Sequence, residues 1–229
     1  MAPKKAINYV LLALFLAFGF SCKKEEQEPV DLGLEYYPVT PGTWVQYKVM
    51  EVNHDEAVSI HDTTYYELKE LIESTFVDNQ GRPSVRIERY KRSDSLSNWQ
   101  ISDVWYATQT NSGLEKIEED VRFLRMSYPV REEREWNGNV YNQQAAWDYF
   151  YEDIESVRTY NNLYFENTLK INQRYNHNLV EFENSFEVYA KHIGLIRKLY
   201  KDFTIINFDT LHPVLGTEIH QTVTGYGSN

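Results

Sequence analysis

Cysteine is nearly absent from this chain, because Cys22 is the only one among 229 residues. An intramolecular disulfide is therefore excluded, and a hydrophobic core must stabilise the fold. Positive charge is also scarce, since 23 Lys and Arg residues stand against 34 Asp and Glu residues, for a formal net charge of −11. This balance argues against binding to nucleic acid and against a basic membrane-binding face.

The motifs that commonly mark catalytic sites are missing as well. The sequence has no Gly-x-Ser-x-Gly nucleophile elbow, no glycine-rich phosphate loop and no aspartate spacing typical of a calcium loop. Carboxylates are plentiful between residues 67 and 120, so a hydrolase with a paired-carboxylate site stays open as an alternative. We expect a protein that is not an enzyme and that needs no cofactor.

Histidines give only a weak indication of a metal site. The closest pair is His54 and His61, each followed by an aspartate. Their separation of seven residues is odd, so on one continuous strand the two side chains would face opposite ways. A loop would be needed to bring them together. We therefore interpret them as polar residues of the first hairpin connection and predict no metal site.

The N-terminus contains the only long apolar run. Lys4 and Lys5 precede the apolar residues 9–20, and the small residue Ser21 comes directly before Cys22. The run is too short to span a bilayer, which needs roughly 20 apolar residues. A basic start, a short apolar core and a small residue together predict an export signal over residues 1–21.

A cysteine at the end of such a segment resembles the lipobox of bacterial lipoproteins, in particular those of the Bacteroidetes. The resemblance implies that Cys22 is the lipid attachment site and becomes the new N-terminus. The polar residues 22–33 then form a tether, in which residues 24–26 (KEE) are similar to a signal for surface exposure in that group. We expect an outer membrane lipoprotein on the periplasmic or the cell-surface side, held to the membrane by its N-terminal lipid anchor.

Residues 34–229 are predicted to form one all-β domain. Alternating patterns over residues 43–52, 64–77, 114–126, 147–157 and 163–175 indicate strands, each of the last three as one continuous segment. Aromatic residues make up 15% of the chain, which fits half-buried pleated faces. Residues 143–149 are the best candidate for a short helix. Evenly spaced strands with short turns predict an antiparallel sheet, either a sandwich or a barrel.

Two segments resemble known patterns. Residues 37–47 (YPVTPGTWVQY) are similar to the opening of many uncharacterised Bacteroidetes lipoproteins. Residues 187–198 (EVYAKHIGLIRK) resemble a hairpin of periplasmic curved-sheet domains related to lipoprotein-carrier half-barrels, with His192 at a position where the pattern has glycine. The resemblance implies a single curved antiparallel sheet that forms an open or half barrel, with at most one or two short helices and a concavity for an apolar ligand.

Aromatic and amide side chains concentrate between residues 99 and 151. Flat rings beside amides are typical of a carbohydrate or peptide platform, although the same rings could fill the core between strands. Binding residues also lie disproportionately on loops, and residues 136–139 are predicted to form one. The candidate ligand-binding residues are Trp136, Asn137, Asn139, Tyr141 and Trp147.

Together these observations predict a lipid-anchored, non-catalytic envelope protein that acts as a binding or interaction module. Its partner would be an apolar small molecule in the concavity of the sheet or another envelope protein. The aromatic and amide side chains between residues 99 and 151 support an alternative function, that of a surface glycan-binding accessory lipoprotein.

Overall fold

The computed structural model describes residues 29–229, of which Asp31–Asn229 form one compact unit. The predicted export signal, the lipid attachment site at Cys22 and most of the tether lie outside the described residues. Within them, no helical element has the length and the apolar character needed to cross a membrane.

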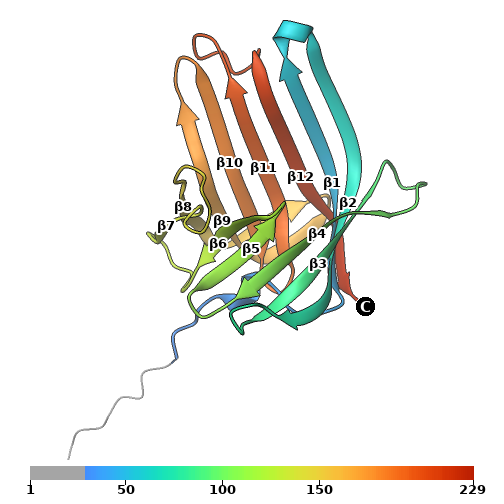
Figure 1. The fold of residues 1–229 in the computed structure, drawn as a ribbon, viewed down its shortest axis with the longest axis vertical. Helices are drawn as coiled ribbons and strands as arrows, with labels where there is room; N and C mark the ends of the chain where they lie inside the picture. The colour runs from blue at the N-terminus through green and yellow to red at the C-terminus, as the bar shows by residue number, and fades with distance from the viewer. Residues whose placement is uncertain (1–28) are drawn as a thin grey trace, which may run out of the picture. The chain divides into compact units, whose positions relative to one another are not determined.

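Twelve strands form one antiparallel sheet, in the order β6-β5-β4-β3-β2-β1-β12-β11-β10-β9-β8-β7 (Figure 1). The chain passes through η1 (Leu34–Tyr36), β1 (Thr43–Asp55), η2 (Glu56–Val58), β2 (Ile60–Val77), β3 (Pro83–Arg92), β4 (Gln100–Gln109), β5 (Gly113–Glu118), β6 (Val121–Ser127), β7 (Glu135–Asn137), β8 (Asp148–Tyr160), β9 (Leu163–His177), β10 (Glu181–Ala190), β11 (Gly194–Thr204) and β12 (Leu215–Ser228). Each strand pairs with the next one along the chain except β6 with β7, and β1 pairs with β12.

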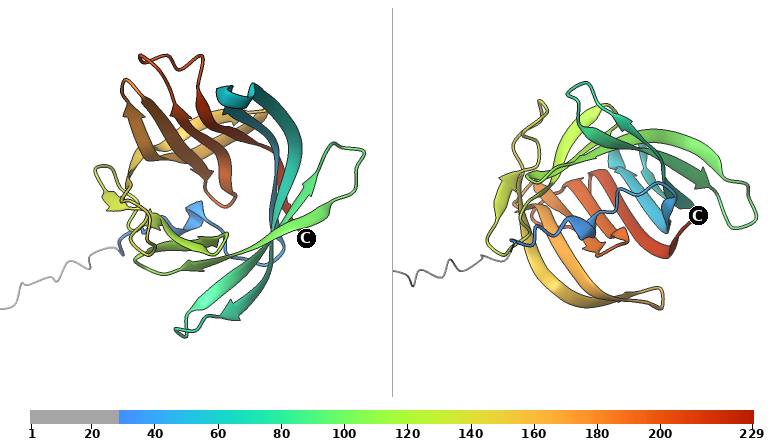
Figure 2. Two further views of the ribbon diagram at one scale, coloured as in Figure 1. Left: turned by 45° about the horizontal axis from the view of Figure 1, so that its top comes forward. Right: turned by 90° about the horizontal axis from the view of Figure 1, so that it is seen from below.

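The sheet is strongly curved, so that its two edge strands come together (Figure 2). The backbone N–H of Leu124 in β6 donates to the carbonyl of Gly138, next to β7, at 2.9 Å. The indole N–H of Trp136 in β7 donates to the carbonyl of Leu124 at 2.9 Å. The prediction of a single curved antiparallel sheet in an open barrel is therefore confirmed, with η1 and η2 as the only helical turns among residues 29–229.

One predicted strand is wrong, because residues 114–126 form the two strands β5 and β6. The hairpin between them turns at Glu119 and Asp120, whose φ angles are 47° and 63°. A two-residue hairpin with positive φ at both positions usually carries Asn or Gly. Two acidic residues fill these positions here, so the turn was not recognisable from residue type.

The predicted short helix over residues 143–149 is also wrong. Residues 143–147 form a loop and residues 148–149 begin β8, and side-chain hydrogen bonds replace helical ones. The backbone N–H of Trp147 donates to Asn137 Oδ1 at 3.2 Å, and Asn139 Nδ2 donates to the carbonyl of Ala145 at 2.6 Å. Residues 136 and 137, predicted to be part of a loop, pair with β8 as strand β7.

Two clusters of buried apolar side chains stabilise the unit. The larger one joins η1 to residues of β2–β11, and Leu114, Met126, Leu169 and Ile171 are fully buried in it. The second one joins β1, β2 and β12 to β9–β11. Asn161, in the β8–β9 turn, donates to the carbonyl of Val223 in β12 at 2.8 Å. These contacts hold the far end of the β8–β9 hairpin against the sheet.

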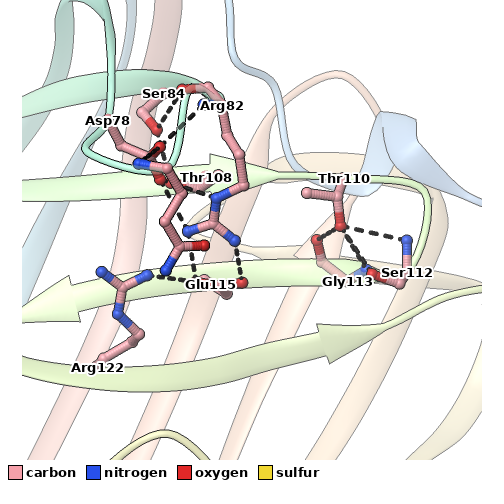
Figure 3. A network of polar contacts seen from close by, with 10 residues as sticks. Asp78, Arg82, Ser84, Thr108, Thr110, Ser112, Gly113, Glu115 and Arg122 are labelled. Atoms are coloured by element: carbon pink, nitrogen blue, oxygen red, sulfur yellow. Dashed lines mark hydrogen bonds and ion pairs between the residues drawn. The ribbon is translucent and has the colours of Figure 1, made fainter.

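A polar network fixes the β2–β3 turn to β5 (Figure 3). The two terminal nitrogens of the Arg82 guanidinium, Nη1 and Nη2, donate to the Glu115 carboxylate at 2.6 and 3.1 Å. The Nε of Arg82 donates to Asp78 at 2.8 Å. Arg122 of β6 contacts the same Glu115 carboxylate. Because side chains alternate along a strand, Glu115 faces away from its neighbour Lys116, which belongs to a different network.

Candidate functional site

A network of buried charges crosses the space that the curved sheet encloses. Its members are Glu70 of β2, Lys116 and Glu118 of β5, Arg125 of β6, Glu187 of β10 and Lys198 of β11. The side chains of Lys116, Arg125 and Glu187 are only 5%, 6% and 3% exposed. Since β6 and β10 lie far apart in the strand order, their contact runs across the interior rather than along the sheet.

Arg125 is the centre of this network. Its guanidinium donates to both carboxylate oxygens of Glu118, at 2.8 and 3.1 Å, and to the hydroxyl of Tyr149 at 3.2 Å. Its Nη1 lies 4.0 Å from Glu187 Oε1. Glu187 also accepts a hydrogen bond from Tyr189 at 2.7 Å. One side chain therefore links β5, β6, β8 and β10.

The charges keep one another ionised. Burial acts to raise the pKa of the Glu118 carboxyl, but the positive charges of Arg125 and Lys116 outweigh it and hold that pKa well below its usual value. Burial also acts to raise the pKa of Glu187, but the positive charges of Arg125 and Lys198 outweigh it and lower that pKa. Burial raises the pKa of Tyr149 to about 12, so its hydroxyl stays neutral.

An open hollow of about 440 Å³ lies beside this network. Its walls combine rings and aliphatic groups with charged and amide groups. The lining residues are Tyr66, Arg89, Trp105, Glu118, Glu119, Val121, Phe123, Gln144, Lys198, Ile219 and Gln221. The Trp105 ring is already covered by cations, because the Arg89 guanidinium lies 3.6 Å and the Lys116 ammonium 4.6 Å from its centroid.

Gln221 of β12 is the one lining residue with an unused buried donor. Its side chain amide nitrogen, Nε2, is buried and has no hydrogen-bond partner within residues 29–229. The residue as a whole is 5% exposed. A buried donor without a partner is unfavourable by about 1–3 kcal/mol, so a ligand oxygen in the hollow would remove this penalty.

A second hollow is much smaller. Its volume is about 30 Å³, and its lining includes Tyr37, Trp44, Ile72 and Leu195. Aromatic side chains of the larger apolar cluster and the charge network lie within the concavity in which an apolar ligand was expected. The larger hollow has mixed walls, which suit an amphipathic molecule better than a purely apolar one.

The five predicted ligand-binding residues lie together around β7 and the loop before β8. Trp136 and Asn139 are buried, and the Trp136 ring packs on Tyr151 with 4.6 Å between centroids. Asn137 holds the loop through its hydrogen bonds to the backbone of Asn139 and Trp147. Tyr141 is 52% exposed. The exposed part of this segment is therefore smaller than a platform of five side chains, and its binding role stays a prediction.

His54 and His61 lie on the same face of the sheet, at directly paired positions on β1 and β2. A loop was expected to be needed to bring the two side chains together, and the turn at η2 between the two strands is that loop. The turn contains no glycine, proline or asparagine.

Comparison with known proteins leaves the family open, because no protein-family model and no curated protein matches the chain. Two solved structures are similar to it. They are a protein named as an exported protein with a YmcC-like fold from Bacteroides fragilis and a protein named as a lipoprotein from Parabacteroides distasonis. Each is 12% identical, with a TM-score of 0.42, over 84% of this chain and 98% of its own.

Sequence reasoning did not single out the charge network. Glu118 is one of many carboxylates, Glu187 and Lys198 are the ends of the segment 187–198, for which only a fold was inferred, and Arg125 and Gln221 belong to no motif. Arg125 and Glu187 alternate with apolar neighbours, which is typical of a strand with one wet face. This face lies in the interior only because the curved sheet closes on itself, and no local sequence pattern indicates that closure.

Proposed function

We propose that this chain is a lipid-anchored, non-catalytic envelope protein that binds a small amphipathic molecule in the hollow beside Gln221. The unused Nε2 donor of Gln221 carries the proposal, since it requires an oxygen acceptor. Tyr66, Phe123 and Ile219 on the same walls supply apolar contact for the rest of such a ligand. The N-terminal pattern that ends at Cys22 supports the lipid anchor.

The charges beside the hollow support a non-catalytic role. A glycosidase needs one carboxyl with a raised pKa to act as general acid. Glu118 and Glu187 are the buried carboxylates next to the hollow, and the pKa of each is lowered. Both therefore favour the ionised form, which stabilises structure but cannot donate a proton.

Native mass spectrometry of residues 23–229, purified gently and followed by organic extraction, tests this proposal. We expect a copurifying amphipathic molecule, and we expect Gln221→Leu to raise its dissociation constant about tenfold through loss of one hydrogen bond, which lowers its occupancy. The variant should unfold at the same or a higher temperature, because it removes an unsatisfied buried donor. Gln100→Leu is the matched control, since Gln100 is exposed and lies outside the hollow.

A protein that purifies empty would overturn the ligand proposal and favour a second candidate, interaction with another envelope protein. This second candidate is supported by one rim of the sheet. At this rim the β1–β2, β9–β10 and β11–β12 connections lie side by side (Figure 1). Their tips expose the apolar residues Val58, Leu179, Val180, Ile206, Phe208 and Leu211. Exposed apolar groups that gather on one surface often mark a protein–protein contact.

A further inference from the structure

The same rim holds two histidines whose ring nitrogens face each other. His54 of β1 and His61 of β2 are paired positions of the ladder, and their Nδ1 atoms are 3.1 Å apart. The rings meet edge to face, with 5.4 Å between centroids. No other pair of histidines within residues 29–229 makes a contact of this kind.

The spacing of the two nitrogens suits chelation. Metal–imidazole bonds are about 2.0–2.1 Å long, so two donors 3.1 Å apart correspond to an angle of roughly 100° at a shared metal ion. That value lies between the right angle of square-planar or octahedral coordination and the tetrahedral angle. Imidazole is a preferred ligand of divalent zinc, copper and nickel.

The surrounding residues hold the pair in place. The Phe203 ring packs edge-on against His54, at 5.4 Å between centroids. The backbone N–H of Glu56 donates to the carbonyl of Val214 at 2.8 Å, which fixes the hairpin to the β11–β12 connection. Chelation therefore needs little rearrangement of the backbone.

The histidine pair borders an open hollow. A hollow of about 380 Å³ is lined by His54, His61, Glu56 and His212, with Leu211 and Pro213. Residues 29–229 contain no ready group of three or more metal-ligating side chains, so water would complete the coordination.

We propose that His54 and His61 form a chelating site for a divalent transition-metal ion at the tip of the β1–β2 hairpin. The site is separate from the hollow beside Gln221 and does not depend on the ligand proposed there. Without a metal ion, one neutral imidazole donates its Nδ1–H to the Nδ1 atom of the other.

Copper(II) is the probe for this proposal, added to the full chain purified in detergent. Calorimetric titration should show one site, and electron paramagnetic resonance should show hyperfine splitting from two imidazole nitrogens. His61→Ala should weaken binding roughly 100-fold, because the second imidazole of a chelating pair binds intramolecularly. His61 is exposed, so this variant should keep the thermal unfolding temperature of the unchanged protein.

His177→Ala is the matched control, because His177 is another exposed histidine of the same rim with no histidine beside it. It should bind copper(II) as tightly as the unchanged protein and keep the two-nitrogen spectrum. Equal affinities of the His61→Ala variant and the unchanged protein would overturn the proposal. A one-nitrogen spectrum of the unchanged protein would overturn it as well.

Discussion

Arg125 shows what a buried charge requires of its neighbours. Moving a guanidinium out of water is costly, and the charge persists only where carboxylates and hydroxyls surround it. Glu118, Tyr149 and Glu187 provide these partners from three other strands. The residue is thus a structural cross-link whose removal leaves two carboxylates with less compensation.

We therefore expect Arg125→Leu to lower the free energy of unfolding by about 3–5 kcal/mol, the range for breaking a buried ion pair. Urea unfolding measures the change. Adding Glu118→Leu should recover part of the loss, because the carboxylate that lost its partner is removed as well. Lys170→Leu, which breaks a more exposed pair with Glu152, should change stability by at most about 1 kcal/mol. If Arg125→Leu and Lys170→Leu lowered the free energy of unfolding equally, Arg125 would not be a buried structural cross-link.

At the scale of elements, alternation predicted most strands because one face of each strand is buried and the other is wet. Residues 43–52 and 163–175 were found within β1 and β9 in this way. The β5–β6 turn was missed, because Glu119 and Asp120 hold positive φ without glycine or asparagine. The helix predicted over residues 143–149 is instead a loop over residues 143–147 and the start of β8, and the loop is held by hydrogen bonds to Asn137 and Asn139, several residues away.

The candidate sites were harder to predict than the strands, because each site brings together residues that are far apart in the sequence. A charge network and a histidine pair both depend on which strands are neighbours, and pairing is a property of the whole sheet. His54 and His61 were noticed from their spacing, but only the hairpin register places them side by side. Arg125 and Glu187 are 62 residues apart and meet across the interior.

A substitution at Gly138 tests how the β7–β8 connection packs against Tyr149. The Tyr149 ring lies against this glycine, and a methyl group there would come within 2.3 Å of the ring. We expect Gly138→Ala to displace Tyr149 from Arg125 and to lower stability by about 1–3 kcal/mol, as overpacking does. Gly225→Ala is the control, because its methyl group would have only ordinary contacts, the nearest at 3.8 Å. Thermal unfolding that is equally lowered in both variants would contradict this packing.

At the scale of the whole molecule, three kinds of contact hold the curved sheet in its closed form. The first is the seam between the edge strands, where Leu124 bonds to Gly138 and to the Trp136 indole. The second is the charge network, which joins β5 and β6 to β8, β10 and β11. The third is the larger apolar cluster, in which Met126 of β6 packs with residues of β7–β9. The seam is short, so closure depends on the apolar cluster and on the charges that face one another across the interior.

Closure should therefore be sensitive to acid. The pKa values of Glu118 and Glu187 are lower in the folded protein than the usual 4.5 of an exposed glutamate, so protons bind the unfolded chain more readily. Their contribution to stability is complete above about pH 4.5 and is lost as the pH falls toward the folded-state values. Hydrogen exchange at decreasing pH should show β6 and β7 opening before β1 and β12.

Glu187→Gln provides the comparison for this pH dependence. The variant should be less stable at pH 7, because Arg125 and Lys198 lose a negative partner. Its stability should then fall less steeply below pH 4.5, since one of the titrating carboxyls is gone. A variant whose stability falls as steeply as that of the unchanged protein would show that acid acts through other carboxyls, and that closure does not rest on this network.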